Sequence, residues 1–414
     1  MAIISVVVEQ HAEEAAFLWL LRDTAVHEPH YYLSDLANLD NRIEAHIDGL
    51  RIAGDEGWEI CKENLAWEEA GEIFTAAVLS FESGKEDRIK NVLEAGSDAP
   101  ELSRGIISAL GWLSYPQAEK FIQRYSSSEL VELRRIGLGA HAVHRKDPGK
   151  TLYDGLSSSD SLLKARTLKA IGELGKKDFA AAVKDHLNDE DENCRFYAAW
   201  SSSLLGNTTG LPVLQNIAET ESPHAERACS IALRRMSVAE GHDWNKAIAK
   251  KTNLQRIAVI GAGAIGDPIL IPWLIEYMSI PEMSRAAGES FTMITGVDLA
   301  YEGLESEWPE GFETGPTENS EDENVEMDPD EDLPWPEPEL IYEWWSKNKN
   351  NFRNGTRYLC GKPISEHQCQ HVLRSGYQRQ RAATAVELAM MRPGTPMFEV
   401  RAPGFRQQQI LGLK

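Results

Sequence analysis

Apolar residues recur along the chain with the spacing of α-helices. Between residues 165 and 175 they return every third position, and between 179 and 187 every fourth. Both spacings predict amphipathic helices, and Gly175 predicts the turn between them. This stretch is therefore predicted to form a helical hairpin. One such hairpin cannot bury its apolar face alone, so hairpins of this kind stack on one another.

The same pattern returns at a nearly constant interval, which is the signature of a repeat architecture. The pairs Leu174-Gly175 and Leu205-Gly206 are 31 residues apart, and Ile265-Gly266 lies about two periods further on. Degenerate copies are found at residues 74–80, 105–114, 134–143, 229–236 and 285–295. We therefore expect an all-α fold, a right-handed α-solenoid of about seven or eight hairpins with non-repeat caps at both ends.

Residues 256–268 raise an alternative, because their glycines match the G-x-G-x-x-G of dinucleotide-binding folds. In that fold a helix begins at the last glycine and faces the phosphates. Here Asp267 and Pro268 follow at once, and Pro272 predicts the next helix start. An acidic residue at the end of a second strand is also required about 20 positions later. Residues 284–287 around that point are helical in character and basic, and Asp298 lies too far along. The stretch is better interpreted as the turn inside one repeat, and no cofactor is predicted.

The flanking regions lack the repeat. Residues 9–26 and 33–51 predict two amphipathic helices, the second ending near Gly49 or Gly54. Further helices are predicted from Pro338 and over 376–391, followed by an irregular, proline-containing segment. The predicted domains are an N-terminal helical cap (1–65), the repeat solenoid (66–301), an acidic Pro-rich loop expected to be disordered (302–340) and a basic C-terminal helical extension (341–414).

Charge is unevenly distributed along the chain, whose net charge is −23. Residues 302–343 hold 17 Asp/Glu and no Lys/Arg, whereas residues 344–414 hold 12 Lys/Arg and 3 Asp/Glu. The acidic total argues against general binding of nucleic acid. No apolar run approaches a membrane span, and the N-terminal run is too short for a signal peptide, so we expect a cytoplasmic protein. The five scattered cysteines, without a C-x-x-C, agree with a reducing compartment.

The turn Gly266-Asp267-Pro268, followed by a proline-started helix, looks like the small HEAT-like repeats of the phycobilin-lyase type. The chain also resembles an uncharacterised bacterial family. The matching stretches are residues 9–19, 46–51, 294–298, 344–345, 357–359 and 401–403. That resemblance implies a HEAT-repeat protein often encoded beside type VI secretion spike and effector genes. It implies a context and supplies no catalytic residues.

Two groups of residues suggest metal sites. Imidazoles, thiolates and carboxylates are common ligands for zinc and iron. The N-terminal group is His11, Glu14, His27, His30, Asp40, His46 and Asp48. The C-terminal group is Cys360, His367, Cys369 and His371. Neither has the ligand spacing of a known site, so helix capping and burial are the favoured interpretations and no metal is predicted.

Candidate partner-binding residues lie near both ends of the chain. They are Trp344, Trp345, Arg357, Arg401, Arg406, His11 and His46. Aromatic residues are frequent binding hot spots, but a C-terminal helix docking onto the solenoid would also use Trp344 and Trp345. The basic tail is expected either to receive the acidic loop of the same chain or to bind an acidic partner.

The favoured function is a non-catalytic scaffold, adaptor or chaperone-like factor, since solenoids present long binding surfaces. The resemblance implies a type VI effector or spike protein as the partner. No G-x-S-x-G elbow or phosphate-binding loop is present, so an enzyme is the less favoured class. Two alternatives stay open: a lyase or isomerase of the phycobilin-lyase type, and a HEAT-like DNA-binding protein. The oligomeric state and the binding face stay open as well.

Overall fold

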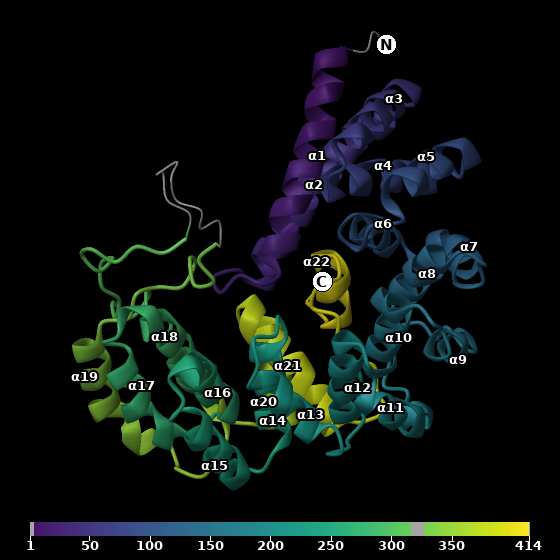
Figure 1. The fold of residues 1–414 in the computed structure, drawn as a ribbon. Helices are drawn as coiled ribbons and strands as arrows, with labels where there is room; N and C mark the ends of the chain where they lie inside the picture. The colour runs from purple at the N-terminus through teal and green to yellow at the C-terminus, as the bar shows by residue number, and fades with distance from the viewer. Residues whose placement is uncertain (1–3, 316–326, 414) are drawn as a thin grey trace. The chain divides into compact units, whose positions relative to one another are not determined.

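A computed structural model describes residues 4–315 and 327–413 and shows an all-α solenoid of stacked helical hairpins (Figure 1). In the described part of the chain, the regular β-structure is one short antiparallel pair, Tyr358–Leu359 (β1) with Lys362–Pro363 (β2). The chain divides into two compact units. Unit 1 comprises residues 1–207 and 377–414, and unit 2 comprises residues 208–376.

Unit 1 stacks its hairpins through their first helices. The helices are α4 (Ala70–Ser83), α5 (Glu86–Gly96), α6 (Pro100–Trp112), α7 (Tyr115–Ser126), α8 (Val131–Val143), α9 (Thr151–Leu156), α10 (Ser161–Glu173), α11 (Ala180–Asp185) and α12 (Glu192–Leu204). Helix α4 packs on α6, α6 on α8, α8 on α10, and α10 on α12. We call these five helices the first helices of unit 1. Their side chains interlock at buried small residues, which bring the helix backbones close.

Unit 2 continues the pattern. Its helices are α13 (Leu211–Ala218), α14 (Ala225–Arg235), α15 (Val238–Ile248), α16 (Gln255–Ile265), α17 (Ile271–Tyr277), α18 (Pro281–Thr295), α19 (Pro338–Asn348) and α20 (Glu366–Ser375). Here α14, α16 and α18 stack as first helices, and α19 packs on α17. Short 3-10 turns join several helices: Leu65–Trp67, Lys177–Phe179, His186–Asn188, Thr252–Leu254, Pro268–Leu270 and Lys349–Asn351.

The glycine-rich stretch is a helix and a turn, as the sequence indicated. Gly261 and Gly263 lie inside α16, where a Cβ at Gly263 would come within 3.0 Å of the Cα of Ser290 on α18. Gly266 ends α16 with φ of 72°, and Asp267 caps the following turn by accepting the N–H of Ile269. The glycines therefore serve close helix packing and a left-handed helix end.

The N-terminal helices are α1 (Ser5–Ala25), α2 (Leu33–Ala53) and α3 (Asp55–Asn64). The helix α2 ends at Gly54, so Gly49 lies inside it. Helix α1 packs on α2 and α4, and the buried Trp19 ring stacks on Phe74 with centroids 5.2 Å apart. These contacts join the cap to the first hairpin.

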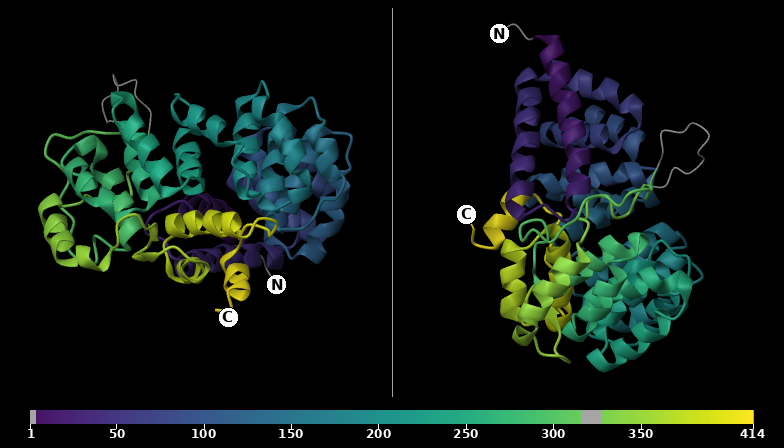
Figure 2. Two further views of the ribbon diagram at one scale, coloured as in Figure 1. Left: turned by 90° about the horizontal axis from the view of Figure 1, so that it is seen from below. Right: turned by 90° about the vertical axis from the view of Figure 1, so that its left-hand side faces the viewer.

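The C-terminal part of unit 1 contains α21 (Gln378–Met391) and α22 (Gly404–Ile410). Helix α21 contacts α12, and α22 contacts α2. Two further views show the yellow C-terminal helices beside the purple N-terminal ones (Figure 2). The segment between them is irregular, as predicted, whereas α22 was not predicted. None of the described helices is long and apolar enough to cross a bilayer.

Candidate functional site

Residues 392–403, which we call the C-terminal strap, cross the carboxyl ends of successive first helices in unit 1. A Cβ at Gly206 would lie 3.0 Å from Pro393, and one at Gly175 would lie 2.5 Å from the carbonyl oxygen of Thr395. Further along, the Met397 N–H donates to the carbonyl of Glu173 at 2.8 Å. The strap therefore runs opposite to the chain direction of the repeats, from α12 toward α6.

Arginines fix the strap to these helix ends. Arg145, just after α8, donates from Nε to the carbonyl of Met397 at 2.6 Å and pairs with Glu399 at 2.9 Å. Arg406, just beyond the strap, donates to the carbonyl of Leu113 at the end of α6. The last carbonyls of a helix lack internal partners and carry partial negative charge, so cations there are stabilising.

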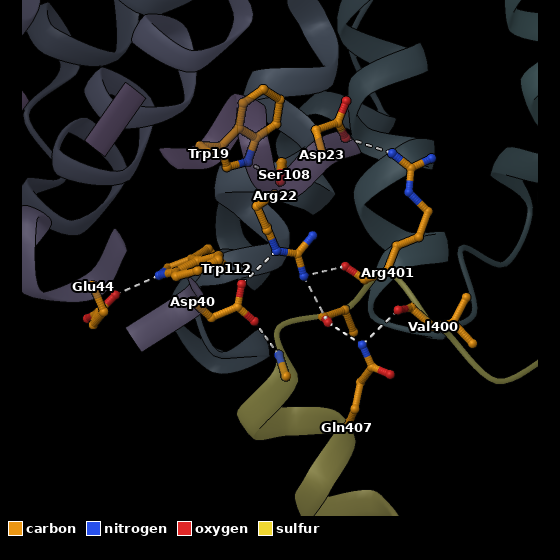
Figure 3. A network of polar contacts seen from close by, with 12 residues as sticks. Trp19, Arg22, Asp23, Asp40, Glu44, Ser108, Trp112, Val400, Arg401 and Gln407 are labelled. Atoms are coloured by element: carbon orange, nitrogen blue, oxygen red, sulfur yellow. Dashed lines mark hydrogen bonds and ion pairs between the residues drawn. The ribbon is translucent and has the colours of Figure 1, made fainter. Parts of the chain in front are cut away.

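A buried ion pair holds the far end of the strap (Figure 3). Arg22 on α1 donates from Nε to Asp40 on α2 at 2.7 Å, and its Nη2 donates to the carbonyls of Arg401 and Ala402 at 2.8 and 3.0 Å. The second Asp40 oxygen accepts the N–H of Gly404 at the start of α22. Both Asp40 oxygens have partners, as do Nε and Nη2 of Arg22, and such pairing is the condition under which buried charge is tolerated.

A second buried arginine supports the cluster from α21. Arg381, which has no exposed surface, donates to Gln407 Oε1 at 2.5 Å, while Gln407 donates to the carbonyls of Val400 and Ala402 at 2.8 and 2.6 Å. Burial lowers the pKa of Arg381 to about 10, so it stays charged near neutral pH. The C-terminal strap is thus held along its length by side chains far away in sequence.

Unit 2 has a comparable segment, residues 355–361, which we call the unit 2 strap. Arg357 donates to the carbonyls of Leu233, Arg234 and Met236 at the end of α14. The Tyr358 N–H then donates to Gly266 at 2.7 Å, and the Cys360 N–H to Met293 at 2.8 Å. The same chemistry, an arginine and main-chain donors on helix carboxyl ends, therefore occurs in both units.

The described flanks of the acidic segment lie against repeat helices of unit 2. Asp330 accepts two hydrogen bonds from Arg256, at 2.6 and 2.9 Å, and Asp328 pairs with Arg285 at 2.7 Å. The Arg285 guanidinium also lies 4.5 Å from the ring centroid of Trp335. These carboxylates pair with arginines of α16 and α18, and not with the basic tail, which was one of the two alternatives left open by the sequence. The central residues 316–326 lie outside the described part of the chain.

The predicted partner-binding residues have mixed surroundings. Trp345 is buried against Phe352, while Trp344 is partly exposed beside Phe291. Arg357 and Arg406 cap helix ends, and Arg401 is exposed and pairs with Asp23 at 2.8 Å. His11 and His46 meet each other between α1 and α2. Helix docking thus accounts for Trp345, and a role of these residues toward a partner stays a prediction.

The C-terminal thiols and imidazoles do not converge. Among the described residues, Cys360, His367, Cys369 and His371 do not place three ligand atoms within reach of one ion. Cys369 is buried in α20, whereas His367 and His371 are exposed. Burial raises the pKa of the Cys360 thiol to about 12, so it is protonated at neutral pH. This disfavours a thiolate nucleophile there.

A row of four cations and one tyrosine, which was not among the predicted site residues, lies on the first helices of unit 1, and we call it the cationic ladder. It comprises Arg104 on α6, Arg134 on α8, Arg166 and Lys169 on α10, and Tyr197 on α12. All are at least partly exposed, and Lys169 lies over the Tyr197 ring at 5.5 Å. The signal in the sequence is a cation or aromatic at intervals of 30 to 32 residues, in phase with the repeat.

Some ladder cations are already paired within the chain. Arg166 binds the buried Glu173 at 2.9 Å, and Arg104 binds Asp23. Burial would raise the pKa of Glu173, but Arg166, Lys169 and Arg145 outweigh it and hold the pKa at about 2. Lys169 lies 3.9 Å from the same Glu173, so the four ladder cations share two carboxylates in these pairs, in a protein that is acidic overall. Such a surface favours an anionic ligand.

Residues 149–234 match the HEAT-repeat family, over the part of the chain that runs from α9 to α14. The chain is therefore similar to HEAT-repeat proteins, whose repeats commonly serve as protein-interaction scaffolds. A comparison with curated proteins finds no match.

Proposed function

We propose that this protein is a non-catalytic scaffold and that the cationic ladder of unit 1 binds an acidic segment of a partner protein. The ladder carries this proposal because its residues occupy one position per repeat on helices that pack directly on one another. The C-terminal strap binds the ends of α8 and α10 and is itself held by the Arg22–Asp40 pair, so we expect the charges to be presented on a rigid frame. A rigid frame lowers the entropy cost of binding.

The spacing of the ladder suggests the form of its ligand. Packed helices lie about 8–10 Å apart, so one cation per first helix repeats at about that distance. A peptide in the polyproline II conformation has three residues per turn and rises about 3.1 Å per residue, so every third side chain lies on one face and would meet a ladder position. The ligand we propose is therefore an extended segment with acidic residues at intervals of three. Tyr197 would pack against an apolar or aromatic residue at one end of it.

We further propose that the partner is a type VI secretion effector or spike protein, which the scaffold holds as an adaptor or chaperone. The support for this identity is the resemblance of residues 9–19, 46–51 and the other matching stretches to a family encoded in that context. The cationic ladder supports the binding of an acidic segment, whichever protein carries that segment.

A peptide-binding experiment tests the ladder. Fluorescence anisotropy would compare a labelled peptide with glutamate at every third position against a peptide of the same composition with clustered glutamates. We expect the spaced peptide to bind more tightly, and binding to weaken as salt rises. The double variant Arg134→Glu/Arg166→Glu should abolish it. The control variant Lys62→Glu/Lys90→Glu makes the same charge change at exposed positions outside the first helices and should bind as the parent does.

Three results would contradict the proposal. Equal binding of the two peptides would remove the argument from spacing, and equal loss in both variants would leave only a general charge effect. Tighter binding of duplex DNA than of peptide, lost in the ladder variant, would favour the DNA-binding alternative. A pull-down from the native host under mild salt, with the ladder variant as control, then identifies the partner.

A further inference from the structure

Residues 328–333, which we call the acidic turn, bind two arginines on neighbouring first helices of unit 2. Asp330 accepts two hydrogen bonds from Arg256 on α16, at 2.6 and 2.9 Å. Asp328 pairs with Arg285 on α18 at 2.7 Å, and Nη1 of Arg285 donates to the carbonyl of Asp330 at 2.9 Å. Two carboxylates that are two positions apart therefore reach cations on two helices that pack on each other.

The two arginines continue the sequence period of the cationic ladder. Arg227, Arg256 and Arg285 follow Tyr197 at intervals of 30, 29 and 29 residues. Each of the three arginines lies near the start of a first helix, as the ladder residues do. The repeat therefore places cations at the same position of the hairpin in unit 2, and at two of these positions the structure shows a bound acidic segment.

The acidic turn is shaped by its own hydrogen bonds. The Asp330 N–H donates to Oδ1 of Asp328 at 2.9 Å, and the Leu333 N–H donates to the carbonyl of Asp330 at 2.9 Å. Pro329 restricts the backbone between the two carboxylates. Because these contacts are local, a short acidic segment of another protein can form the same turn and present its carboxylates in the same way.

The acidic turn satisfies the arginines incompletely. Among the described residues, Nε of Arg285 is buried without a hydrogen-bond partner, and Oδ2 of Asp328 accepts no hydrogen bond although it lies 2.7 Å from that guanidinium. A cavity of about 470 Å³ lies beside the turn, and both arginines, Phe312 and Pro329 contribute to its lining. A buried donor without a partner is unfavourable, so a ligand that also engages Arg285 Nε would bind better than the turn does.

Each arginine has a second partner that does not belong to the turn. Nε of Arg256 donates to Glu226 on α14 at 2.9 Å. The Arg285 guanidinium lies 5.4 and 4.5 Å from the ring centroids of Trp308 and Trp335, where a cation is attracted to the ring faces. We therefore expect both cations to keep their positions when the turn leaves.

We propose that Arg256 and Arg285 form a second binding site for a partner's acidic segment, and that the acidic turn occupies it as an internal competitor. A partner segment has to displace the turn before it binds. A tethered segment competes at an effective concentration of about 1 mM, so weakly binding acidic peptides are excluded. The identity of the ligand as a partner's segment rests on the proposed function, whereas the site itself uses residues of the other unit, so either can fail alone.

Peptide binding to a released variant of the full chain tests the site. Asp328→Asn/Asp330→Asn removes both charges from the turn, and a labelled synthetic peptide of residues 327–337 is the probe in fluorescence anisotropy. We expect this variant to bind the peptide at least about tenfold more tightly than the parent, in which the tethered turn competes. Adding Arg256→Gln to the released variant should abolish binding, whereas adding Lys246→Gln, at an exposed position of α15, should leave it unchanged.

The charge-matched control is Glu331→Gln/Asp332→Asn, at exposed positions of the same turn, which should bind the peptide as the parent does. An equal gain in this control would overturn the proposal, because the change in overall charge would then explain the binding. A released variant that keeps the parent's helix content by circular dichroism and binds no more tightly would overturn it too. If the double variant loses helix content, Asp330→Asn alone is measured against the same two outcomes.

A last comparison separates this site from the ladder of unit 1. In the released variant, Arg134→Glu/Arg166→Glu should leave binding of the 327–337 peptide unchanged. Loss of binding in that background, with no loss on Arg256→Gln, would assign the peptide to unit 1. That result would refute the site on α16 and α18 and leave the proposed function standing.

Discussion

Arg22 donates to Asp40 at 2.7 Å, and the two side chains are only 6% and 1% exposed. The same guanidinium donates to the carbonyls of Arg401 and Ala402, and the second Asp40 oxygen accepts from Gly404. One ion pair between the first two helices therefore positions a segment more than 350 residues away in sequence.

Asp40→Asn should destabilise unit 1 by about 3–5 kcal/mol, because it leaves the buried Arg22 charge without its counter-ion. Lys62→Ala, which breaks the exposed pair of Lys62 with Glu59, should cost less than about 1 kcal/mol. Urea unfolding measures both. Limited proteolysis should cut the C-terminal strap faster in Asp40→Asn alone. Equal stability losses in the two variants would show that the buried pair contributes no more than a surface one.

Gly266→Ala tests the unit 2 strap. Gly266 and Gly303 have similar positive φ angles, 72° and 65°, so alanine at either costs about 1–2 kcal/mol in backbone strain. A Cβ at Gly266 would also lie 2.5 Å from the carbonyl oxygen of Tyr358, whereas nothing lies within 4 Å of one at Gly303. We expect Gly266→Ala to lower the free energy of unfolding by about 1–3 kcal/mol more than Gly303→Ala does. Equal losses of unfolding free energy in the two variants would mean that the unit 2 strap shifts away from residue 266 at no cost.

The hairpins could be predicted because their signals are local. The apolar period of residues 165–175 and the turn at Gly266 and Asp267 depend on neighbours within a few positions, and the structure places helices and a turn there. Because each weak pattern recurs at the repeat interval, the copies together strengthen the prediction. Gly49 was harder to interpret from the sequence, because a glycine there suggested the end of a helix. In the structure it lies inside α2, where a Cβ would collide with the ring of His11.

The straps could not be predicted because their hydrogen bonds join distant residues. Arg357 binds carbonyls more than 120 positions earlier, and the main chain of residue 397 binds Glu173. The residues next to Arg357 in the sequence do not show whether its side chain caps a helix end of the same chain or binds a partner protein. The ladder could have been found from the sequence, since Arg104, Arg134 and Arg166 keep the repeat period. Whether the side chains of the ladder are exposed, however, depends on which face of each helix is buried by the adjacent helices.

The thiols should be slow to react in the folded protein. Burial raises the pKa of Cys61, Cys194 and Cys360 to about 12 and raises that of Cys229 further, and Cys369 is fully buried. Thiolate is the reactive form, so Ellman's reagent should label native protein slowly and all five thiols in urea. Cys360, which is partly accessible, should react first. A thiol that reacts rapidly in the native state would revive the lyase alternative.

Glu173 should make the stability of unit 1 depend on pH. Its carboxylate is buried beside Arg166, Lys169 and Arg145, and its pKa is held at about 2 despite the opposing effect of burial. Because the folded pKa lies below the unfolded value, the stabilisation is complete above about pH 5 and is lost as the pH falls toward 2. Glu173→Gln removes that ionisation without removing the side-chain volume.

Unfolding free energies of the parent and Glu173→Gln should therefore differ by up to about 3 kcal/mol at neutral pH, and the difference should shrink on acidification. Glu63→Gln, at an exposed position of α3, is the control and should show little difference at either pH. A gap between parent and Glu173→Gln that stays constant from neutral pH to about pH 3 would mean that the three cations do not hold this carboxylate ionised.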